Sequence, residues 1–207
     1  MADLIESYIE LTLKTEDLML DCVHHYFMPC DQQRKVEELK NLVRRVEAGV
    51  GVVFINTCDF ARRVTEMLTR EGLKVALLMG KDMTVGERTL TMEDFRAGKF
   101  AALITTNLLA RGIDNTLVRW VVNFDLPGYR KQGQFEPDLD LYVHRSGRAG
   151  RFGRPGVAIS FVTGANDQAI IEEVSKELVC EIKEFNLDEI NNYIKAEVET
   201  ETDEVKE

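Results

Sequence analysis

The sequence predicts an α/β fold: a doubly wound parallel sheet with helices on both faces, formed by a single domain. Short apolar runs rich in branched side chains recur along the chain, as expected for strands that are buried on both faces. Segments with helical spacing of apolar residues separate the runs, and this alternation favours a parallel sheet covered by helices. The predicted strands span residues 50–56, 75–79, 100–106, 120–125 and 157–162.

The helices are expected where apolar residues recur every three or four positions. Leu39, Leu42 and Val46 show this spacing within a predicted helix over residues 31–47. The same pattern predicts helices over residues 59–71, 85–96 and 166–179. Residues 24–28, a short apolar run that precedes the first helix, are expected to add an edge strand to the sheet.

The amino-acid composition predicts where the folded domain begins and ends. Residues 1–15 are predicted to be a lead-in linker, residues 16–187 the folded domain, and residues 188–207 a terminal helix with an acidic, partly disordered tail. This last segment holds eight acidic residues against two lysines and is too polar to form a core. Since it supplies much of the formal net charge of -10, the acidity does not exclude an anionic ligand for the body.

Several protein classes are disfavoured by the sequence. No uncharged apolar run approaches the roughly 20 residues that a membrane span needs, and the acidic start is unlike a secretory signal. The four cysteines contain no C-x-x-C pair and only three histidines occur, so no metal site is predicted. We expect a soluble intracellular protein with reduced thiols and no membrane partner.

Polar residues gather just after two of the predicted strands, where parallel sheets bind their ligands. Thr57 follows the first strand and is placed to cap the next helix, whose free backbone N–H groups would suit a phosphate. A helix cap alone is the alternative at that position. After the third strand comes T-T-N-L-L-A-R-G-I-D, which sets hydroxyl, amide, guanidinium and carboxylate groups in one stretch: Thr106, Asn107, Arg111, Gly112 and Asp114.

The segment H-R-S-G-R-A-G-R-F-G-R concentrates positive charge without an acidic residue. Arg145, Arg148 and Arg151 recur every three residues, a spacing that would place them on one side of a helical turn. Guanidinium groups bind phosphate bidentately, so these arginines indicate a polyanion as partner. The alternative is that they pair with acidic residues from distant segments of the chain.

A nucleotide-holding loop is missing from the sequence. Its two Gly-Lys pairs, at positions 80–81 and 98–99, are followed by aspartate and phenylalanine, so no G-x-x-x-x-G-K-[ST] motif exists. If the arginines meet a nucleotide, another domain must hold it.

Together these strings resemble a known family. T-T-N-L-L-A-R-G-I-D and H-R-S-G-R-A-G-R-F-G-R are similar to motifs V and VI of the DEAD-box ATP-dependent RNA helicases, in their usual order, and V-V-F-I-N-T resembles motif IV. The resemblance runs from about residue 16 to about residue 179. It covers only the second of the two RecA-like lobes of the family, since the nucleotide-holding loop and the D-E-A-D segment are absent.

The resemblance also points to a branch of the family. Fourteen residues separate Pro127 from Tyr142, where most members have a short connection. This lengthened connection is similar to that of the helicases of messenger RNA export. The expected location is therefore cytoplasmic or nuclear, including the nuclear pore.

The resemblance implies roles for the nucleotide side. ATP with Mg2+ would be held mainly by the first lobe, and Arg148 and Arg151 would be catalytic residues that reach the γ-phosphate, with Arg151 as the arginine finger. Asp114 matches the aspartate that approaches the ribose. His144 matches the histidine that couples the lobes, although a packed structural histidine is the alternative. Arg111 is expected to join this coupling, to join the residues that contact RNA, or to brace its loop.

The resemblance places a second set of residues on the backbone of single-stranded RNA, where contacts position the strand without reading its sequence. These residues are Thr57, Arg88, Thr106, Asn107 and Gly112. The expected partners are this RNA, the N-terminal lobe of the same protein, and export or translation factors. The function implied is RNA-stimulated ATP hydrolysis that unwinds short duplexes or remodels RNA–protein complexes, with the chain alone inactive.

The sequence departs from the family pattern at two places and leaves rival functions open. Met79 replaces the histidine of the family's L-H-G, Lys81 is inserted, and Val85 replaces the glutamine of Q-x-x-R. These changes put the local geometry around Arg88 in doubt. Ser146 and Ala149 change motif VI without removing a charge.

One rival function is a protein-docking module for export or translation factors without activity of its own. Another is a lobe of a different motor, of the translation-initiation type or acting on DNA.

Overall fold

The computed structural model describes residues 23–46, 49–80, 82–107, 117–131, 134–150, 156–188 and 190–191. The predicted linker over residues 1–15 and most of the predicted tail lie outside these ranges. Within them, no helix combines the length and the apolar character needed to cross a membrane.

Seven parallel strands form one sheet, in the order β3-β4-β2-β5-β8-β1-β9. The predicted parallel sheet is confirmed, because each of the five predicted runs overlaps one of these strands. Their bounds are β1 Val23–Pro29, β2 Val50–Phe54, β3 Val75–Leu78, β4 Ala102–Thr105, β5 Val118–Asn123, β8 Gly156–Val162 and β9 Ile182–Glu184.

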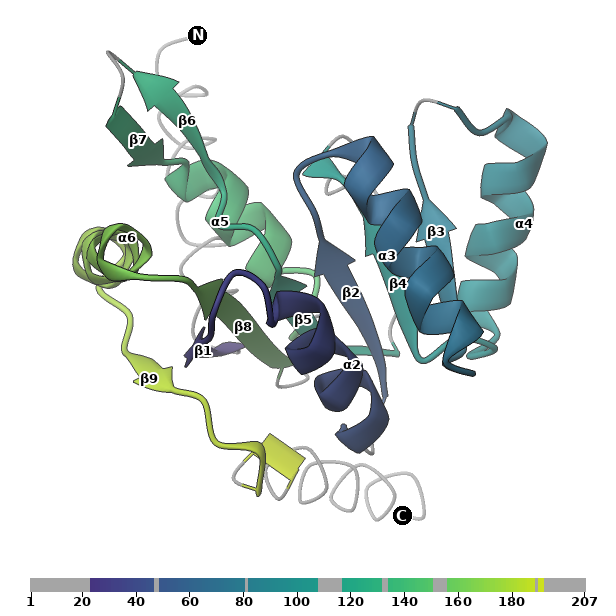
Figure 1. Cartoon of the computed structure of the whole chain (residues 1–207), viewed down its shortest axis with the longest axis horizontal. Helices are drawn as coiled ribbons and strands as arrows, with labels where there is room; N and C mark the ends of the chain where they lie inside the picture. The colour runs from purple at the N-terminus through teal and green to yellow at the C-terminus, as the bar shows by residue number, and fades with distance from the viewer. Residues whose placement is uncertain are drawn as a thin grey trace, which may run out of the picture.

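Helices cover both faces of the sheet, as the sequence predicts (Figure 1). Buried side chains of α2 and α3 pack on one face, and buried side chains of α4, α5 and α6 pack on the other. The predicted helix over residues 85–96 matches α4 in full. The bounds are α2 Lys35–Arg45, α3 Cys58–Arg70, α4 Val85–Arg96, α5 Leu139–Ser146 and α6 Ala165–Glu177.

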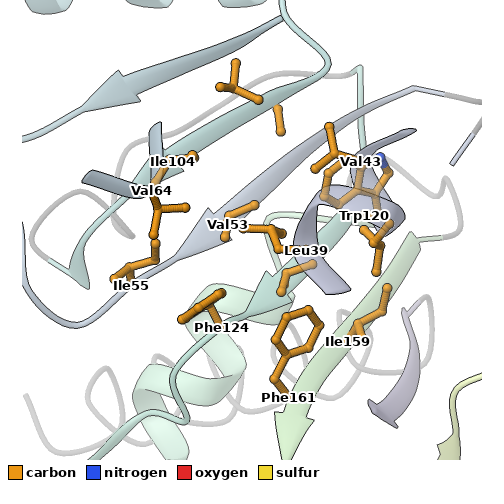
Figure 2. Packing of buried hydrophobic residues seen from close by; sticks show 14 of the residues in the cluster. Leu39, Val43, Val53, Ile55, Val64, Ile104, Trp120, Phe124, Ile159 and Phe161 are labelled. Atoms are coloured by element: carbon orange, nitrogen blue, oxygen red, sulfur yellow. The ribbon is translucent and has the colours of Figure 1, made fainter. Parts of the chain in front are cut away.

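The largest buried cluster lies between the sheet and the helices α2 and α3 (Figure 2). Val53 and Ile55 point to this face, whereas their neighbours Val52 and Phe54 point to the other, because side chains alternate along a strand. Trp120 lies opposite Gly51, where a Cβ atom would come within 2.2 Å of the indole ring. Glycine at position 51 therefore makes room for the tryptophan.

Two parts of the fold differ from the sequence prediction. Residues 24–28, expected to be an edge strand, lie in β1, which pairs with β8 on one side and with β9 on the other. The prediction of an edge position was wrong because β9 is short and half polar and gave no strand signal in the sequence. The lengthened connection after Pro127 forms a two-stranded antiparallel hairpin, β6 Gly128–Lys131 and β7 Gln134–Pro137.

The packed body also extends past the predicted domain boundary at residue 187. Ile190 is buried in the largest cluster, and the side-chain amide of Asn191 donates to the carbonyl of Arg45 at the end of α2. The beginning of the predicted terminal helix thus packs against the domain.

A buried polar pair joins β1 to α5. The Nδ1 atom of His25 lies 3.0 Å from the hydroxyl of Tyr142, and the two rings stack with centroids 5.6 Å apart. The Nε2 atom of His25 is buried without a hydrogen-bond partner among the described residues. Burial, with a smaller contribution from the neighbouring His24, lowers the pKa of His25 from 6.5 to about 4. His25 is therefore neutral in the folded protein at neutral pH.

We predict that this histidine makes the protein less stable at mildly acidic pH. Between pH 6.5 and about 4 the unfolded chain binds a proton at position 25 and the folded chain does not, so stability falls as the pH drops through that window. The loss attributable to this group reaches about 3 kcal/mol. Urea unfolding at a series of pH values measures it.

The variant that isolates this group is His25→Gln, which should flatten the dependence of stability on pH below 6.5. Equal pH profiles for wild type and His25→Gln would contradict the prediction.

Candidate functional site

The segments that follow β4, β2 and β5 meet at one edge of the sheet, because these three strands are neighbours and run in parallel. Thr106 and Asn107 follow β4, Asn56 and Thr57 follow β2, and Asp125 follows β5. The prediction that the polar residues after β2 and β4 share one edge is therefore confirmed. We call this the carboxyl edge.

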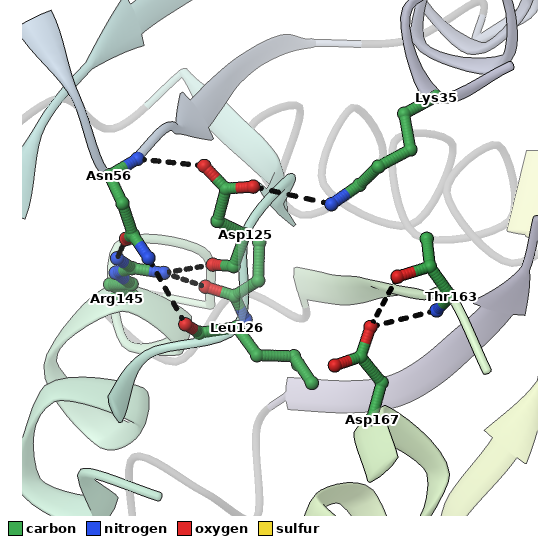
Figure 3. Close-up of polar contacts among 8 residues, drawn as sticks. Lys35, Asn56, Asp125, Leu126, Arg145, Thr163 and Asp167 are labelled. Carbon is green, nitrogen blue, oxygen red and sulfur yellow. Dashed lines mark hydrogen bonds and ion pairs between the residues drawn. The ribbon is translucent and has the colours of Figure 1, made fainter. Parts of the chain in front are cut away.

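A single guanidinium group connects these segments (Figure 3). Arg145 lies in the last turn of α5, and its side chain extends toward the ends of β2, β4 and β5. Its Nε donates to Asn107 Oδ1 at 3.1 Å, and its Nη2 donates to the same oxygen and to Asn56 Oδ1 at 2.9 Å. Its Nη1 donates to Asn123 Oδ1 at 3.1 Å and to the carbonyl of Asp125 at 2.7 Å. All three nitrogens of the guanidinium are thereby used.

The oxygen atoms around Arg145 are amide and carbonyl oxygens, and the side chain is fully buried over the ring of Phe54. Burial lowers the pKa of Arg145 to about 10, and the nearby charges of Asp125 and Asp138 oppose that change. The group remains charged at neutral pH. Because α5 ends at Ser146 and the Arg145 guanidinium is enclosed by the protein, this arginine binds oxygen atoms of the chain itself.

Thr57 stands at the start of α3, as predicted, but its side chain does not cap the helix. The residue has extended backbone dihedrals and is exposed, and no side-chain hydrogen bond closes the first turn at this N-cap. The neighbouring Asn56 is engaged elsewhere through its bond with Arg145. The start of α3 therefore presents backbone N–H groups and a hydroxyl at the carboxyl edge.

The start of α4 has a different character. Thr84 caps the helix in a reciprocal arrangement with Glu87, whose carboxylate accepts from the backbone and the hydroxyl of Thr84. The bond from the Thr84 backbone is the main reason that the pKa of Glu87 is lowered. A carboxylate thus already occupies this helix end.

Arg88 is held beside that cap. Its Nη1 donates to the carbonyl of Gly80 at 2.8 Å, which braces the loop between β3 and α4. Met79 is buried and its N–H is directed at the sulfur of Met83, while Val85 is 70% exposed at the first position of the helix. Of the departures from the family pattern, Met79 thus lies before the loop and Val85 opens α4, while Lys81 lies outside the described residues.

The residues after β4 are enclosed to different degrees. Thr106 is 6% exposed, and the hydroxyl of its neighbour Thr105 donates to the carbonyl of Leu78 at 2.8 Å. Asn107 turns its side-chain oxygen to Arg145, so its amide nitrogen is the group left for a ligand.

His144 and Arg148 lie around the end of α5. The Nδ1 atom of His144 is 2.8 Å from the carbonyl of Asp140, and the Nε of Arg148 donates to the carbonyl of His144 at 3.0 Å. Arg148 is only 7% exposed. Arg148 therefore lies just after the end of α5 and is bonded to the last turn of that helix, which also carries Arg145.

Four of the predicted site residues, Arg111, Gly112, Asp114 and Arg151, lie outside the described residues. Within the described ranges, no cluster of three or more His, Cys, Asp or Glu side chains could hold a metal ion. The nucleotide side of the site is thus described through His144 and Arg148 alone.

Sequence reasoning missed the residues that organise the carboxyl edge. Arg145 was considered as a ligand-binding group, and Asn56, Asn123 and Asp125 were not singled out. A signal existed, because all three are polar residues at or just beyond the ends of buried strands. Each of the three falls within a predicted strand, and each binds Arg145, which lies on a distant segment of the chain.

A family model described as helicase conserved C-terminal domain matches residues 34–153, more than half of the chain. The chain belongs to this helicase family. The match covers the strands that end at the carboxyl edge and the segment that carries Arg145 and Arg148.

Curated and solved relatives place the chain more narrowly within the helicase family. An ATP-dependent RNA helicase named dbp5 from Sclerotinia sclerotiorum is 39% identical over 181 residues, which are 87% of this chain and 38% of that protein. A structure of S. cerevisiae Dbp5 bound to RNA and ADP-BeF3 superposes with a TM-score of 0.77 at 38% identity, covering 85% of this chain and 45% of that one. The chain therefore spans less than half the length of each of these helicases.

A third relative is a single lobe. The C-terminal domain of an S. cerevisiae Dbp5 variant bound to Gle1 and IP6 superposes with a TM-score of 0.71 at 36% identity, covering 86% of this chain and 99% of that one. These helicase relatives confirm the resemblance to the second RecA-like lobe of a DEAD-box protein of the messenger RNA export branch.

We predict that Arg145 holds the carboxyl edge through geometry as well as charge. Arg145→Lys keeps a positive charge but cannot supply a five-donor fork, so at least two of the buried oxygen atoms lose their donor. The free energy of unfolding should fall by about 3 kcal/mol, measured by urea denaturation.

Arg62→Lys is the matched control for that variant. Arg62 is exposed and forms a surface pair with Asp82, so its replacement should change the free energy of unfolding by less than about 0.5 kcal/mol. Equal losses for the two variants would contradict the assigned role of Arg145.

Proposed function

We propose that the chain is the second lobe of an ATP-dependent RNA helicase of messenger RNA export. In the whole protein this lobe closes with the first lobe on ATP and single-stranded RNA, and the closed form separates short duplexes or remodels RNA–protein complexes. The observation that carries the proposal is the junction at Arg145. It ties the end of β2 and the segment after β4, where RNA contacts are expected, to the helix that leads into the nucleotide-sensing arginines.

The donor groups of the carboxyl edge fit phosphate ligands. The start of α3 offers unbonded backbone N–H groups beside the hydroxyl of Thr57, and Asn107 offers an amide nitrogen. Together with Thr106, Gly112 and Arg88, these groups would contact the sugar-phosphate backbone. Contacts of that type hold any sequence, as a general unwinding motor requires.

The nucleotide side is proposed on the same basis. Arg148 and Arg151 would reach the γ-phosphate, Asp114 the ribose, and His144 with Arg111 would couple the lobes. Mg2+ would be held mainly by the first lobe, as the family resemblance implies. ATP supplies a triphosphate whose charge builds up on the transferred phosphoryl group, and an arginine finger counters that charge.

Coupling within the lobe follows from how Arg145 is bound. Since its bonds reach three strand ends at once, a displacement of the arginine segment is transmitted to Asn56 and Asn107. The lobe would therefore move as one body when it closes, and RNA binding on one part of the edge would favour the nucleotide-bound position of the other.

The proposed partners and location rest on the Dbp5 relatives. Since the C-terminal domain of Dbp5 binds Gle1, we infer that this lobe docks an export factor and works at the cytoplasmic or nuclear side of the nuclear pore. Docking would add to the helicase function and would not replace it.

The direct test joins the chain to the first lobe of a close relative and measures ATP hydrolysis with RNA, with DNA of the same sequence, and without nucleic acid. We expect turnover only in the joined protein, accelerated by RNA and not by DNA, because the 2′-hydroxyl distinguishes the two. A joined protein that remains inactive while the lone chain binds Gle1 tightly would favour the docking module.

We predict that Arg151→Ala in the joined protein lowers RNA-stimulated turnover by about 10³-fold, the effect of removing an arginine finger. Arg70→Ala is the control, since Arg70 is exposed at the end of α3 and pairs only with Glu66 among the described residues. Wild-type turnover in the Arg151 variant would remove this residue from the mechanism.

A further inference from the structure

Lys35 is a buried lysine that has no part in the function proposed above. It is the first residue of α2, and its side chain is 5% exposed. Its ammonium group lies 3.2 Å from Asp125 Oδ1 and 4.7 Å from the centre of the Phe124 ring (Figure 3). A lysine in such a position has lost most of its hydration, and these two contacts offset part of that loss.

Its partner Asp125 stands where three segments meet. One carboxylate oxygen faces Lys35, and the other accepts the backbone N–H of Asn56 at 2.9 Å. The carbonyl of Asp125 accepts from Arg145 at 2.7 Å. The pair therefore joins α2 to the end of β2 and to the arginine junction.

Asn56 forms three hydrogen bonds, through its backbone N–H and both polar atoms of its side chain. Its N–H donates to Asp125, its side-chain nitrogen donates to the carbonyl of Leu126 at 3.4 Å, and its side-chain oxygen accepts from Arg145. The next residue is Thr57, which opens α3. The peptide orientation at Asn56 thus sets the direction in which Thr57 and the start of α3 face.

A buried ion pair is weak support for stability, because the loss of hydration offsets the attraction between the charges. Its orienting effect is the larger consequence here. The Asp125 side chain is 27% exposed, so without the ammonium of Lys35 its carboxylate would be free to turn to solvent and release the N–H of Asn56.

We propose that Lys35 and Asp125 are positioning residues that orient Thr57 and the start of α3 for contact with the RNA backbone. This inference rests on the proposed function, since it concerns the RNA side of the carboxyl edge. Lys35 touches neither RNA nor nucleotide and acts through Asp125 and Asn56.

The chain contains a matched control on the same helix. Lys40 is also a largely enclosed lysine of α2, 16% exposed, and it pairs with Glu37 and with Glu71. Glu71 is the C-cap of α3, so Lys40 ties α2 to the far end of the helix whose start Lys35 supports. Lys35→Met and Lys40→Met therefore make the same substitution on α2, the first at a lysine that supports the start of α3 and the second at a lysine that contacts its end.

The first measurement is amide hydrogen exchange of the 207-residue chain by NMR. Lys35→Met should speed exchange of the Asn56 amide about tenfold relative to the amides of β5, and Lys40→Met should leave that ratio unchanged. Exchange rates of the β5 amides show whether each variant is folded. Unchanged exchange at Asn56 in a folded Lys35→Met chain would overturn the inference.

The second measurement is the affinity of the joined two-lobe protein for single-stranded oligouridylate, followed by fluorescence anisotropy, together with its rate of ATP hydrolysis. Lys35→Met should weaken RNA binding about fivefold while turnover at saturating RNA stays within about twofold of wild type. Lys35→Arg, which can still pair with Asp125, should recover most of the affinity, and Lys40→Met should bind as wild type does.

The outcomes separate the two proposals. If the wild-type joined protein fails to bind oligouridylate, the proposed function fails, and the exchange measurement still decides whether the pair orients Asn56. If the wild type binds and the Lys35→Met and Lys40→Met variants bind equally well, the positioning role is wrong while the helicase function stands. Equal loss of turnover and affinity in Lys35→Met would indicate a general loss of structure and also overturn it.

Discussion

The hydrogen bonds of the Arg145 guanidinium are the constraint on which the carboxyl edge depends. A planar group with five donors reaches oxygen atoms on the ends of β2, β4 and β5 from one point on α5. Lysine, with a single ammonium on a flexible stem, could not satisfy acceptors in these separate directions. The relative placement of three strand ends is thus set by the geometry of one side chain.

Three acidic groups near the carboxyl edge form structural contacts. The Asp125 carboxylate is shared between Lys35 and the Asn56 N–H, Asp138 caps α5 through the N–H of Leu141, and Glu87 closes the start of α4. In contrast, the start of α3 has no side-chain cap. Although the net charge of the chain is -10, these three carboxylates are bonded within the protein, and the enclosed arginine adds positive potential to the proposed phosphate-binding edge. Asp59, in the first turn of α3, adds a negative charge there.

The two buried polar systems of the lobe are continuous. Asn123 accepts from Arg145 and donates to the hydroxyl of Ser160 at 3.2 Å, and Ser160 in turn interacts with Tyr142, the partner of His25. These contacts therefore link polar groups on β1, β5, β8 and α5 in one network. Because an unmet buried polar atom is costly, a network of this kind allows few alternative arrangements of these segments.

Much of the fold and the location of the site followed from the sequence alone. Apolar runs and helical spacing are local patterns, so the five strands, the α4 helix and the parallel arrangement could be predicted. The short motifs placed Thr57, Thr106, Asn107 and Arg148 near one edge. β9 and the hairpin of β6 and β7 were not predicted because their short, polar strands lack such a pattern.

Only the tertiary structure decided what the arginines and the polar strand ends do. Arg145, Arg148 and Arg151 are equivalent in sequence spacing, yet Arg145 is enclosed and bonded to residues 38 and 89 positions away in the chain. The role of Lys35 depends in the same way on Asp125, 90 positions further along. Local sequence determines which element a residue belongs to, whereas the choice between binding a ligand and holding the protein together depends on which distant oxygen atoms the fold brings within reach.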